Sequence, residues 1–255
     1  MTSTTRNKGI LLKNKAVKLI LPLIAIFAIW EISAIAINES IILPTVEETI
    51  LSLFKTVIDK SFLRIVAIAF LRVAAGIISG VLLGIILATL CHYFTLADTL
   101  ITPIISIMKA TPVACMIILL WISMSYTEIA VFVVVLMVMP IIWQNILDGY
   151  RSINKELDEV ATVYNFSIAK RIKLLIIPSL FNYLKPALVT SIGLAWKAEI
   201  AAEIVTYNNI GQLIYYYKNS PPIETAPIFA WTIIIVTFSI LLERLTKMLM
   251  GRLEK

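Results

Sequence analysis

Among the ionisable residues within apolar stretches of the sequence, four are candidates for a functional role: Lys109, Lys197, Glu199 and Glu203. A charged side chain at the centre of a membrane span costs about 2.5–3.5 kcal/mol on insertion scales, so it is expected to face the protein interior. Lys197 is neither three nor four residues from either glutamate, which predicts only a loose pairing with them. We predict that all four are pathway or gate residues. Lys109 lies about two turns inside its apolar run, where snorkelling to the inner surface is the alternative.

The sequence offers little for catalysis or metal binding. It holds two cysteines, Cys91 and Cys115, and the single histidine His92, without the spacing of a disulfide framework or a metal site. It also lacks a phosphate-binding loop of the G-x-x-x-x-G-K-S/T type. A membrane-embedded enzyme would need clustered His, Asp or Cys residues at one membrane face. We therefore predict no catalytic residue, no metal and no cofactor bound by this chain.

The composition is that of an integral membrane protein. Of 255 residues, 60% are hydrophobic and only 15% are charged, whereas soluble domains are nearer half apolar and a quarter charged. The net charge of +6 could suggest nucleic acid binding, but no basic, aromatic-interleaved surface supports it. Positive charge on cytoplasmic loops explains the excess more simply.

Six apolar runs predict an all-α fold with about six transmembrane helices. A helix of about 20 residues crosses a hydrocarbon core of about 30 Å. The third run is interrupted at Lys109-Ala110-Thr111-Pro112, where the proline predicts a kink, and a short inner turn is expected around residues 95–98. The runs cover about residues 19–37, 66–92, 101–124, 129–146, 184–205 and 228–242, the last being short for a span.

Basic residues before the first run and after the last predict that both termini are cytoplasmic. We expect a cytoplasmic N-terminus over residues 1–18, one transmembrane domain over 19–246 and a cytoplasmic tail over 247–255. Ala34-Ile35-Ala36 imitates a signal-peptidase site, so cleavage is an alternative. The apolar run before this site exceeds a typical signal segment, which favours a retained helix.

Two further patterns concern helix ends and helix packing. Thr45 and Glu48 form a capping box before an amphipathic helix that reaches about residue 60, expected at the outer membrane surface. Gly76, Gly80 and Gly84 recur every four residues, which predicts a close helix-packing face within the subunit or between subunits. Arg72, one turn earlier, is expected to snorkel to the outer boundary.

A polar interruption over residues 148–178 is the most distinctive stretch. It turns charged and basic for about thirty residues, although a short turn would suffice to join two spans. Its lysines and arginines predict a cytoplasmic location. A docking surface for a soluble partner is therefore the favoured interpretation.

Within this stretch stand Glu159-Val160-Ala161, Asn165, Leu175 and Ile177-Pro178. The spacing resembles the EAA loop of permease subunits of ATP-binding-cassette (ABC) importers: Glu-Ala-Ala, three residues, Gly, nine residues, Ile, one residue, Leu-Pro. Four letters depart from that pattern, and Asn165 for Gly is the departure with physical content. Asparagine tolerates the positive φ expected in the turn, and Ser167 can cap the helix that follows.

The resemblance implies a half-pore in the bacterial cell membrane, formed with a second copy of the permease. A separate ATPase subunit would bind the ATP and receive the loop in a groove, with Glu159 meeting a basic residue and Ala161 allowing close approach. An external solute-binding protein would deliver the solute. Lys170, Arg171 and Lys173 are expected at the lipid headgroups.

The choice of solute rests on weaker patterns. Leu43-Pro44-Thr45, the glycine face, Pro103 with Lys109 and Pro112, and Ala201-Ala202-Glu203 with Gly211-Gln212-Leu213 resemble the branch of nitrate, sulfonate and taurine importers. A cationic wall suits such an oxyanion, while a heterocyclic vitamin precursor is an alternative solute. An ion-driven secondary transporter is the alternative function, but it predicts paired inverted repeats with broken helices, and the two halves show no such correspondence.

Overall fold

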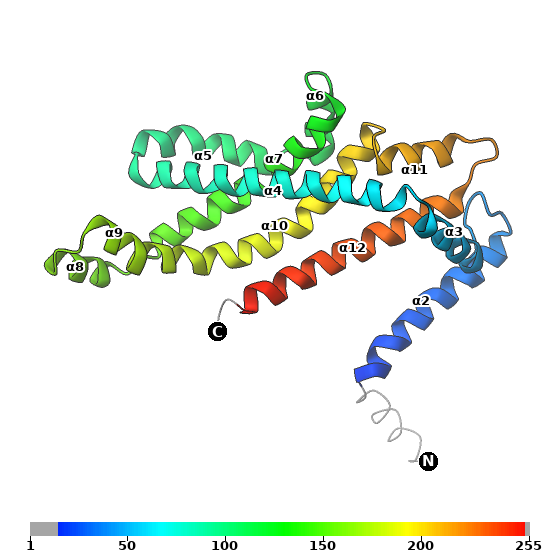
Figure 1. The fold of residues 1–255 in the computed structure, drawn as a ribbon, viewed down its shortest axis with the longest axis horizontal. Helices are drawn as coiled ribbons and strands as arrows, with labels where there is room; N and C mark the ends of the chain where they lie inside the picture. The colour runs from blue at the N-terminus through cyan, green and yellow to red at the C-terminus, as the bar shows by residue number, and fades with distance from the viewer. Residues whose placement is uncertain (1–14, 253–255) are drawn as a thin grey trace, which may run out of the picture. The chain divides into compact units, whose positions relative to one another are not determined.

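The computed structural model describes residues 15–252, and in this range the chain is helical with no strand (Figure 1). The all-α expectation is confirmed. The basic residues Arg6, Lys8 and Lys13 of the expected N-terminal segment lie outside the described residues. The helices are α2 (Lys15–Ile37), α3 (Val46–Ile58), α4 (Phe62–Tyr93), α5 (Thr95–Ala110), α6 (Val113–Trp121), α7 (Tyr126–Arg151), α8 (Lys155–Val163), α9 (Ile168–Arg171), a π-helical turn η1 (Ile172–Ile176), α10 (Ile177–Val205), α11 (Ile210–Asn219) and α12 (Thr225–Arg252).

Five helical stretches are long and apolar enough to cross a membrane, and the pair α5–α6 brings the number to six if it counts as one span. This pair bends by 103°. Thr111 is extended (φ −78°, ψ 127°) because Pro112 disfavours helical geometry in the residue before it. The predicted kink is therefore a sharp break, and Lys109 lies in the last turn of α5.

Two predicted boundaries are wrong. The inner turn expected around residues 95–98 is helical: α4 reaches Tyr93, Phe94 alone is extended (φ −125°, ψ 109°), and α5 begins at Thr95. The last span, expected over 228–242, is a helix of 28 residues. It continues through its charged end, where Lys247 Nζ donates to Glu243 Oε1 at 2.6 Å, a spacing of four residues that favours a helix.

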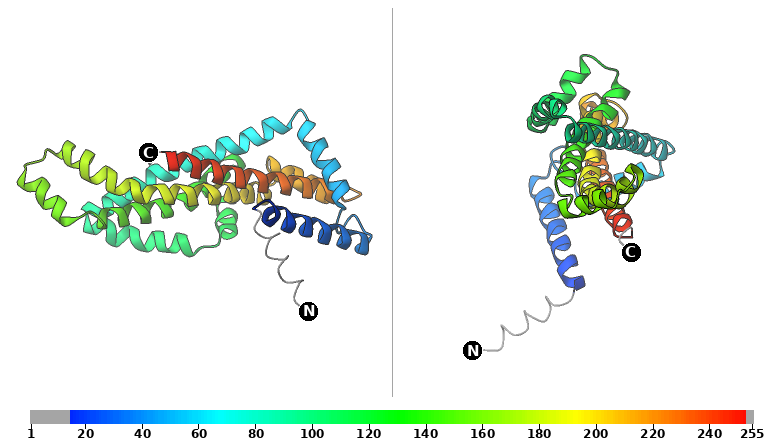
Figure 2. Two further views of the ribbon diagram at one scale, coloured as in Figure 1. Left: turned by 90° about the horizontal axis from the view of Figure 1, so that it is seen from below. Right: turned by 90° about the vertical axis from the view of Figure 1, so that its left-hand side faces the viewer.

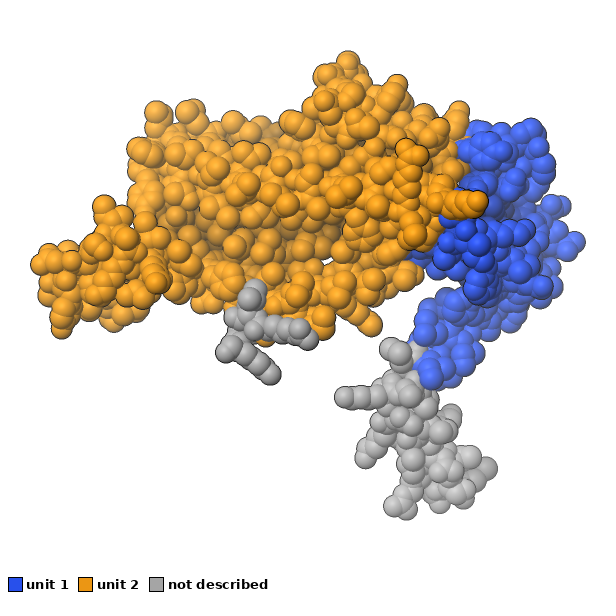
Figure 3. All heavy atoms as spheres, viewed as in Figure 1, with its two compact units in different colours: residues 1–59, 216–234 blue, residues 60–215, 235–255 orange. Residues whose placement is uncertain are grey.

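The chain divides into two compact units (Figure 3). The first takes in the chain as far as Asp59 together with Tyr216–Ile234. In it, the turn between α2 and α3 is fixed by two hydrogen bonds: Trp30 Nε1 donates to Pro44 O at 2.9 Å and Val46 N donates to Glu31 Oε2 at 2.8 Å. Thr45 and Glu48 form the predicted capping box.

The apolar side of α3 is left uncovered by the described residues. Ile50, Phe54, Val57 and Ile58 are 45–79% exposed. An amphipathic helix with such a face is suited to a membrane surface.

The second unit, Lys60–Tyr215 and Ile235 onward, is built on α4, α7 and α10, with α7 packed against both others. The glycine face of α4 lies against α7, so it packs within the chain. A Cβ added at Gly76, Gly80 or Gly84 would approach side-chain atoms of α7 to 2.5–2.9 Å, which only glycine avoids. Beside it, α6, α7 and α10 share a buried cluster of Ile117, Ile129, Ala130, Val133, Ala198 and Ala202. The short helices α8 and α9 lie at one end of α7 and α10 (Figure 2).

Candidate coupling segment and buried ion pair

The polar interruption folds as two short helices. After α7 ends at Arg151, the Asn154 side chain caps α8 by accepting from Glu156 N at 2.8 Å. Ser167 caps α9 by accepting from Lys170 N at 3.3 Å, as the sequence predicts. Both caps satisfy backbone donors that a helix start leaves free.

Asn165 makes the turn between the two helices. Its φ is 48°, in the left-handed region that asparagine tolerates better than most residues. Phe166 N donates to Ala161 O at 2.9 Å and Asn165 N to Thr162 O at 3.0 Å, the two bonds of a Schellman motif. The positive φ expected at Asn165 is thus present in the structure.

An ion pair between Arg171 and Asp158 forms a tie between α8 and α9. The Arg171 guanidinium donates from Nε to Asp158 Oδ1 at 2.8 Å, and its Nη2 contacts the same carboxylate. The hydrogen bond from Arg171 holds the pKa of the Asp158 carboxyl below its usual range. Because a lowered pKa means that folding favours the carboxylate, the tie is present near neutral pH and is lost as acid protonates Asp158.

The segment leaves an apolar surface uncovered beside a carboxylate. Glu159 is exposed and pairs with no other described residue. The uncovered apolar residues are Leu157, Val160, Val163 and Tyr164, 46–76% exposed. Ala161, by contrast, is buried at 4% exposure. Contiguous exposed apolar surface marks an interaction site.

Pro178 lies in the first turn of α10 and is exposed. The π-helical turn Ile172–Ile176 directly precedes α10. A proline clashes with the carbonyl four residues earlier in a regular helix, and a wider turn relieves that crowding at Leu174. The helix from α9 into α10 therefore continues past the proline.

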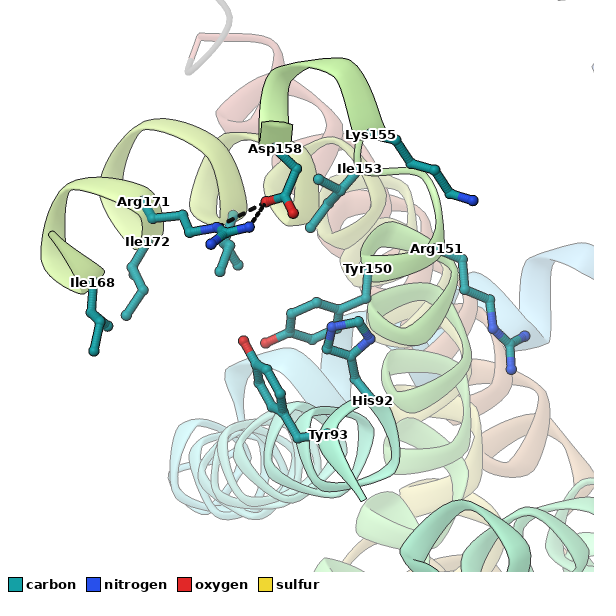
Figure 4. Close-up of a pocket in the computed structure, with 11 residues that line it drawn as sticks. His92, Tyr93, Tyr150, Arg151, Ile153, Lys155, Asp158, Ile168, Arg171 and Ile172 are labelled. Atoms are coloured by element: carbon teal, nitrogen blue, oxygen red, sulfur yellow. Dashed lines mark hydrogen bonds and ion pairs between the residues drawn. The ribbon is translucent and has the colours of Figure 1, made fainter. Parts of the chain in front are cut away.

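A cavity of about 780 Å³ lies between the ends of α4 and α7 and the helices α8, α9 and η1 (Figure 4). His92 stacks on Tyr150 with ring centroids 4.2 Å apart and planes 11° apart. Thr89 Oγ1 lies 3.2 Å from the Tyr150 hydroxyl. The lone histidine thus belongs to an aromatic group at the ends of two long helices.

A buried ion pair joins α4 to α10. Arg72 Nη1 lies 2.7 Å from Glu203 Oε1, with the two side chains 12% and 0% exposed. Asn209 Nδ2 and Ile210 N also donate to this carboxylate, at 2.9 and 3.1 Å. The expectation that Arg72 snorkels to the boundary is wrong, because the arginine has an internal counter-ion.

The chain segment that follows α10 folds back and packs against Glu203. Asn209, at φ 47°, also donates from Nδ2 to Ile65 O at 3.0 Å. A Cβ on Gly211 would stand 1.9 Å from the Glu203 carbonyl oxygen, so only glycine permits this approach. The Ala-Ala-Glu and Gly-Gln-Leu motifs therefore form one structural unit.

The structure brings two of the four pathway candidates together. Glu199 is fully buried, close enough to Glu203 and Arg72 for their charges to interact, and neither of its carboxylate oxygens has a hydrogen-bond partner among the described residues. Lys197 is exposed and interacts electrostatically with Glu243 rather than with the two glutamates. Lys109 is exposed as well. A pathway role for these four residues stays a prediction.

Arg72 is the functional-site residue that the sequence argument assigned to the wrong environment. It stands in an apolar run near the same membrane boundary as Glu203. A charge in such a run needs a counter-charge, and that signal could have indicated the pair.

Comparison with known families settles what kind of protein carries these features. A family model described as "Binding-protein-dependent transport system inner membrane component" matches residues 80–255. The chain belongs to this family. It is thus a multi-pass membrane protein and an ABC transporter permease.

Two relatives and one solved structure are similar to this permease. The bicarbonate transport system permease proteins CmpB of Synechococcus elongatus and of Synechococcus sp. are each 30% identical over 115 residues. The match covers 45% of this chain and 41% of each relative, less than half of either length. The crystal structure of an amino acid ABC transporter with histidines has the same fold, with a TM-score of 0.59, 14% identity, and coverage of 74% of this chain and 91% of that one.

Proposed function

We propose that this permease forms half of the membrane pathway of an ABC importer and receives the work of a separate ATPase through residues 148–178. Two copies make the pathway, both termini and the coupling segment face the cytoplasm, and a binding protein delivers solute from outside. The ATPase binds and hydrolyses ATP, while this chain is non-catalytic and holds no cofactor.

The observation that carries the proposal is the two-helix segment α8–α9. It combines the EAA spacing, a left-handed turn at Asn165 and a bare apolar surface around Glu159. A mere connection between spans needs none of these. A partner groove would cover the apolar residues, and a basic residue in it would pair with Glu159.

A small oxyanion is the solute that the chemistry favours. The matched relatives are named for bicarbonate transport, and the branch that the sequence resembles handles nitrate, sulfonates and taurine. Lys109 and Lys197 supply exposed positive charge on α5 and α10. Either cation, lining a water-filled path, would attract an anion.

Charge reversal at Glu159 tests the coupling role. In a permease purified from membranes with its ATPase, Glu159→Lys should lower the retained ATPase at least tenfold, because a positive charge would face a basic residue across the contact. Glu156→Lys is the matched control: it makes the same charge change on the exposed surface of α8 and should retain the ATPase.

Membrane content of both variants is measured alongside, so that loss of the protein is not mistaken for loss of docking. Full ATPase retention and normal solute uptake in the Glu159 variant would remove the proposed coupling role.

A further inference from the structure

The cavity at the base of the coupling segment has a polar wall suited to an anion. The hydroxyls of Tyr93 and Tyr150 point into the same space, and the Arg171 guanidinium lies above them (Figure 4). The stack on His92 and the contact with Thr89 fix the Tyr150 ring. The Tyr150 hydroxyl donates to Thr89 Oγ1, because Thr89 donates its own proton to Ile85 O at 2.7 Å. The Tyr93 hydroxyl and the guanidinium remain as donors that can bind phosphate oxygens.

Arg171 has a donor nitrogen left for a ligand. Asp158 occupies Nε and Nη2 of Arg171, which leaves Nη1 without a partner among the described residues. Arg151 and Lys155 also belong to the lining, but their charged ends turn away from the tyrosine hydroxyls. Arg171 is therefore the cation that a bound anion would meet.

The opposite wall is apolar. Ile168 and Ile172, from α9 and η1, are 81% and 41% exposed and face the cavity, and Ile153 and Ile176 also belong to its lining. A free inorganic anion would leave these isoleucines bare, whereas an amphiphile would cover them. About 25 cal/mol for each Å² of apolar surface removed from water favours an occupant that carries an acyl chain.

The depth of the site also fits a lipid. Tyr93 ends α4 and Tyr150 lies in the last turn of α7, so both stand where a spanning helix leaves the apolar layer. Tyrosines at this level meet lipid headgroups. Basic pockets between helices at the cytoplasmic surface are suited to anionic headgroups.

From these observations we propose that the cavity binds an anionic phospholipid of the inner leaflet, with its phosphate on Arg171 and Tyr93 and an acyl chain along the isoleucine wall. The lipid bridges α9 and η1 to the ends of α4 and α7, and so braces the segment that meets the ATPase. The inference rests on the proposed function for the cytoplasmic position of this segment.

Lipid retention in the purified permease–ATPase complex tests the site. The complex is equilibrated with phosphatidylglycerol or with zwitterionic phosphatidylethanolamine, and the lipids that remain bound are counted by native mass spectrometry. Arg171→Gln should weaken phosphatidylglycerol binding about tenfold or more, the usual effect of losing a charge-assisted hydrogen bond. Lys218→Gln, which removes an exposed charge on α11 outside the lining, should not.

Asp158→Asn separates lipid binding from the tie between α8 and α9. It breaks the ion pair as Arg171→Gln does, but it frees the guanidinium, so phosphatidylglycerol should be retained at least as well as in the wild type. Equal loss in both variants would mean that the tie, and not the lipid contact, is responsible, and would overturn the proposal.

Two further variants test the walls. Tyr93→Phe removes one hydroxyl and should weaken binding severalfold, and Ile168→Ser should weaken it for lipid while leaving any effect of inorganic phosphate unchanged. Unchanged lipid retention in Arg171→Gln overturns the proposal. So does stabilisation by inorganic phosphate alone without preference for phosphatidylglycerol, which would assign the site to a free anion.

The proposed function is checked in the same preparation. If the ATPase does not co-purify, the coupling proposal fails before any lipid is counted. If a coupled complex forms and retains no phosphatidylglycerol through Arg171, only the lipid site fails.

Discussion

At the scale of single residues, the pair between Arg72 and Glu203 has the largest predicted effect on stability. Both side chains are withdrawn from solvent, and removing one partner leaves the other charge buried and unpaired. Such a loss typically costs about 3–5 kcal/mol. Arg72→Leu and Glu203→Leu should each lower the melting temperature of the purified permease strongly, and the double variant should recover part of the loss.

Glu199→Gln is the control for this pair. Glu199 lies one turn from Glu203 and is equally buried, but its carboxylate has no hydrogen-bond partner among the described residues. Replacing it with a neutral side chain of the same shape should not lower the melting temperature.

A double variant at Arg72 and Glu203 that is as unstable as the sum of its singles would contradict the direct pairing.

The left-handed turn at Asn165 gives a second prediction at this scale. Asn165→Gly should keep ATPase-coupled uptake, because glycine adopts a φ of 48° freely. Asn165→Val should lose it, since a left-handed conformation costs an ordinary residue about 1–2 kcal/mol and a β-branched side chain resists it further. Uptake is measured in membrane vesicles that contain each variant. Equal activity of the two variants would contradict the need for a left-handed conformation at this position.

The turn at Asn165 and the ion pair of Arg72 differ in how far the sequence alone predicts them. The conformation of Asn165 follows from local spacing and from the backbone preference of asparagine, so it was predictable. The partner of Arg72 lies 131 residues away, and no local pattern carries that contact. What the sequence does supply is the rule that a charge in an apolar run needs a partner.

At the scale of elements, the glycine face of α4 sets how closely it approaches α7. A Cβ on Gly80 would stand 2.9 Å from Val138 Cβ, a part of the valine that cannot swing away. Gly80→Ala should therefore destabilise the permease by about 1–3 kcal/mol, the usual cost of overpacking. Gly193→Ala is the matched control, because nothing lies within 4 Å of a Cβ there.

Thermal unfolding in detergent measures both alanine variants. In the control, the gain in helix propensity of about 0.5–1 kcal/mol should appear as unchanged or raised stability. If both variants lose the same amount, the close contact of α4 with α7 does not limit the packing.

The boundaries of the helices show where local sequence patterns stop predicting the structure. The break at Pro112 was predictable because proline acts on its own neighbours. The helical start at Thr95 was not, since Thr95, Asp98 and Thr99 are typical of a turn in isolation. Phe94 alone makes the reversal, and α5 then packs on α4 and α7, a tertiary effect that local composition does not reveal.

At the scale of the whole molecule, five spans and a bent pair form one half of the proposed pathway, and charge along that pathway would attract or repel a solute. Lys197 projects from the spanning helix α10 and is exposed. In a water-filled path this ammonium would attract an anion, opposed only in part by Glu243. Lys197→Gln should therefore raise the KM for bicarbonate or nitrate uptake about tenfold, which corresponds to about 1.4 kcal/mol of lost attraction.

The matched control is Lys218→Gln, which removes an exposed charge from α11 outside the spans. Uptake of labelled bicarbonate, nitrate and taurine into vesicles with the binding protein and ATP compares the two. A change in KM confined to the Lys197 variant would identify α10 as a wall of the pathway. If both variants transport anions with the wild-type KM, Lys197 faces lipid or the second copy, and the preference for an oxyanion must come from the binding protein.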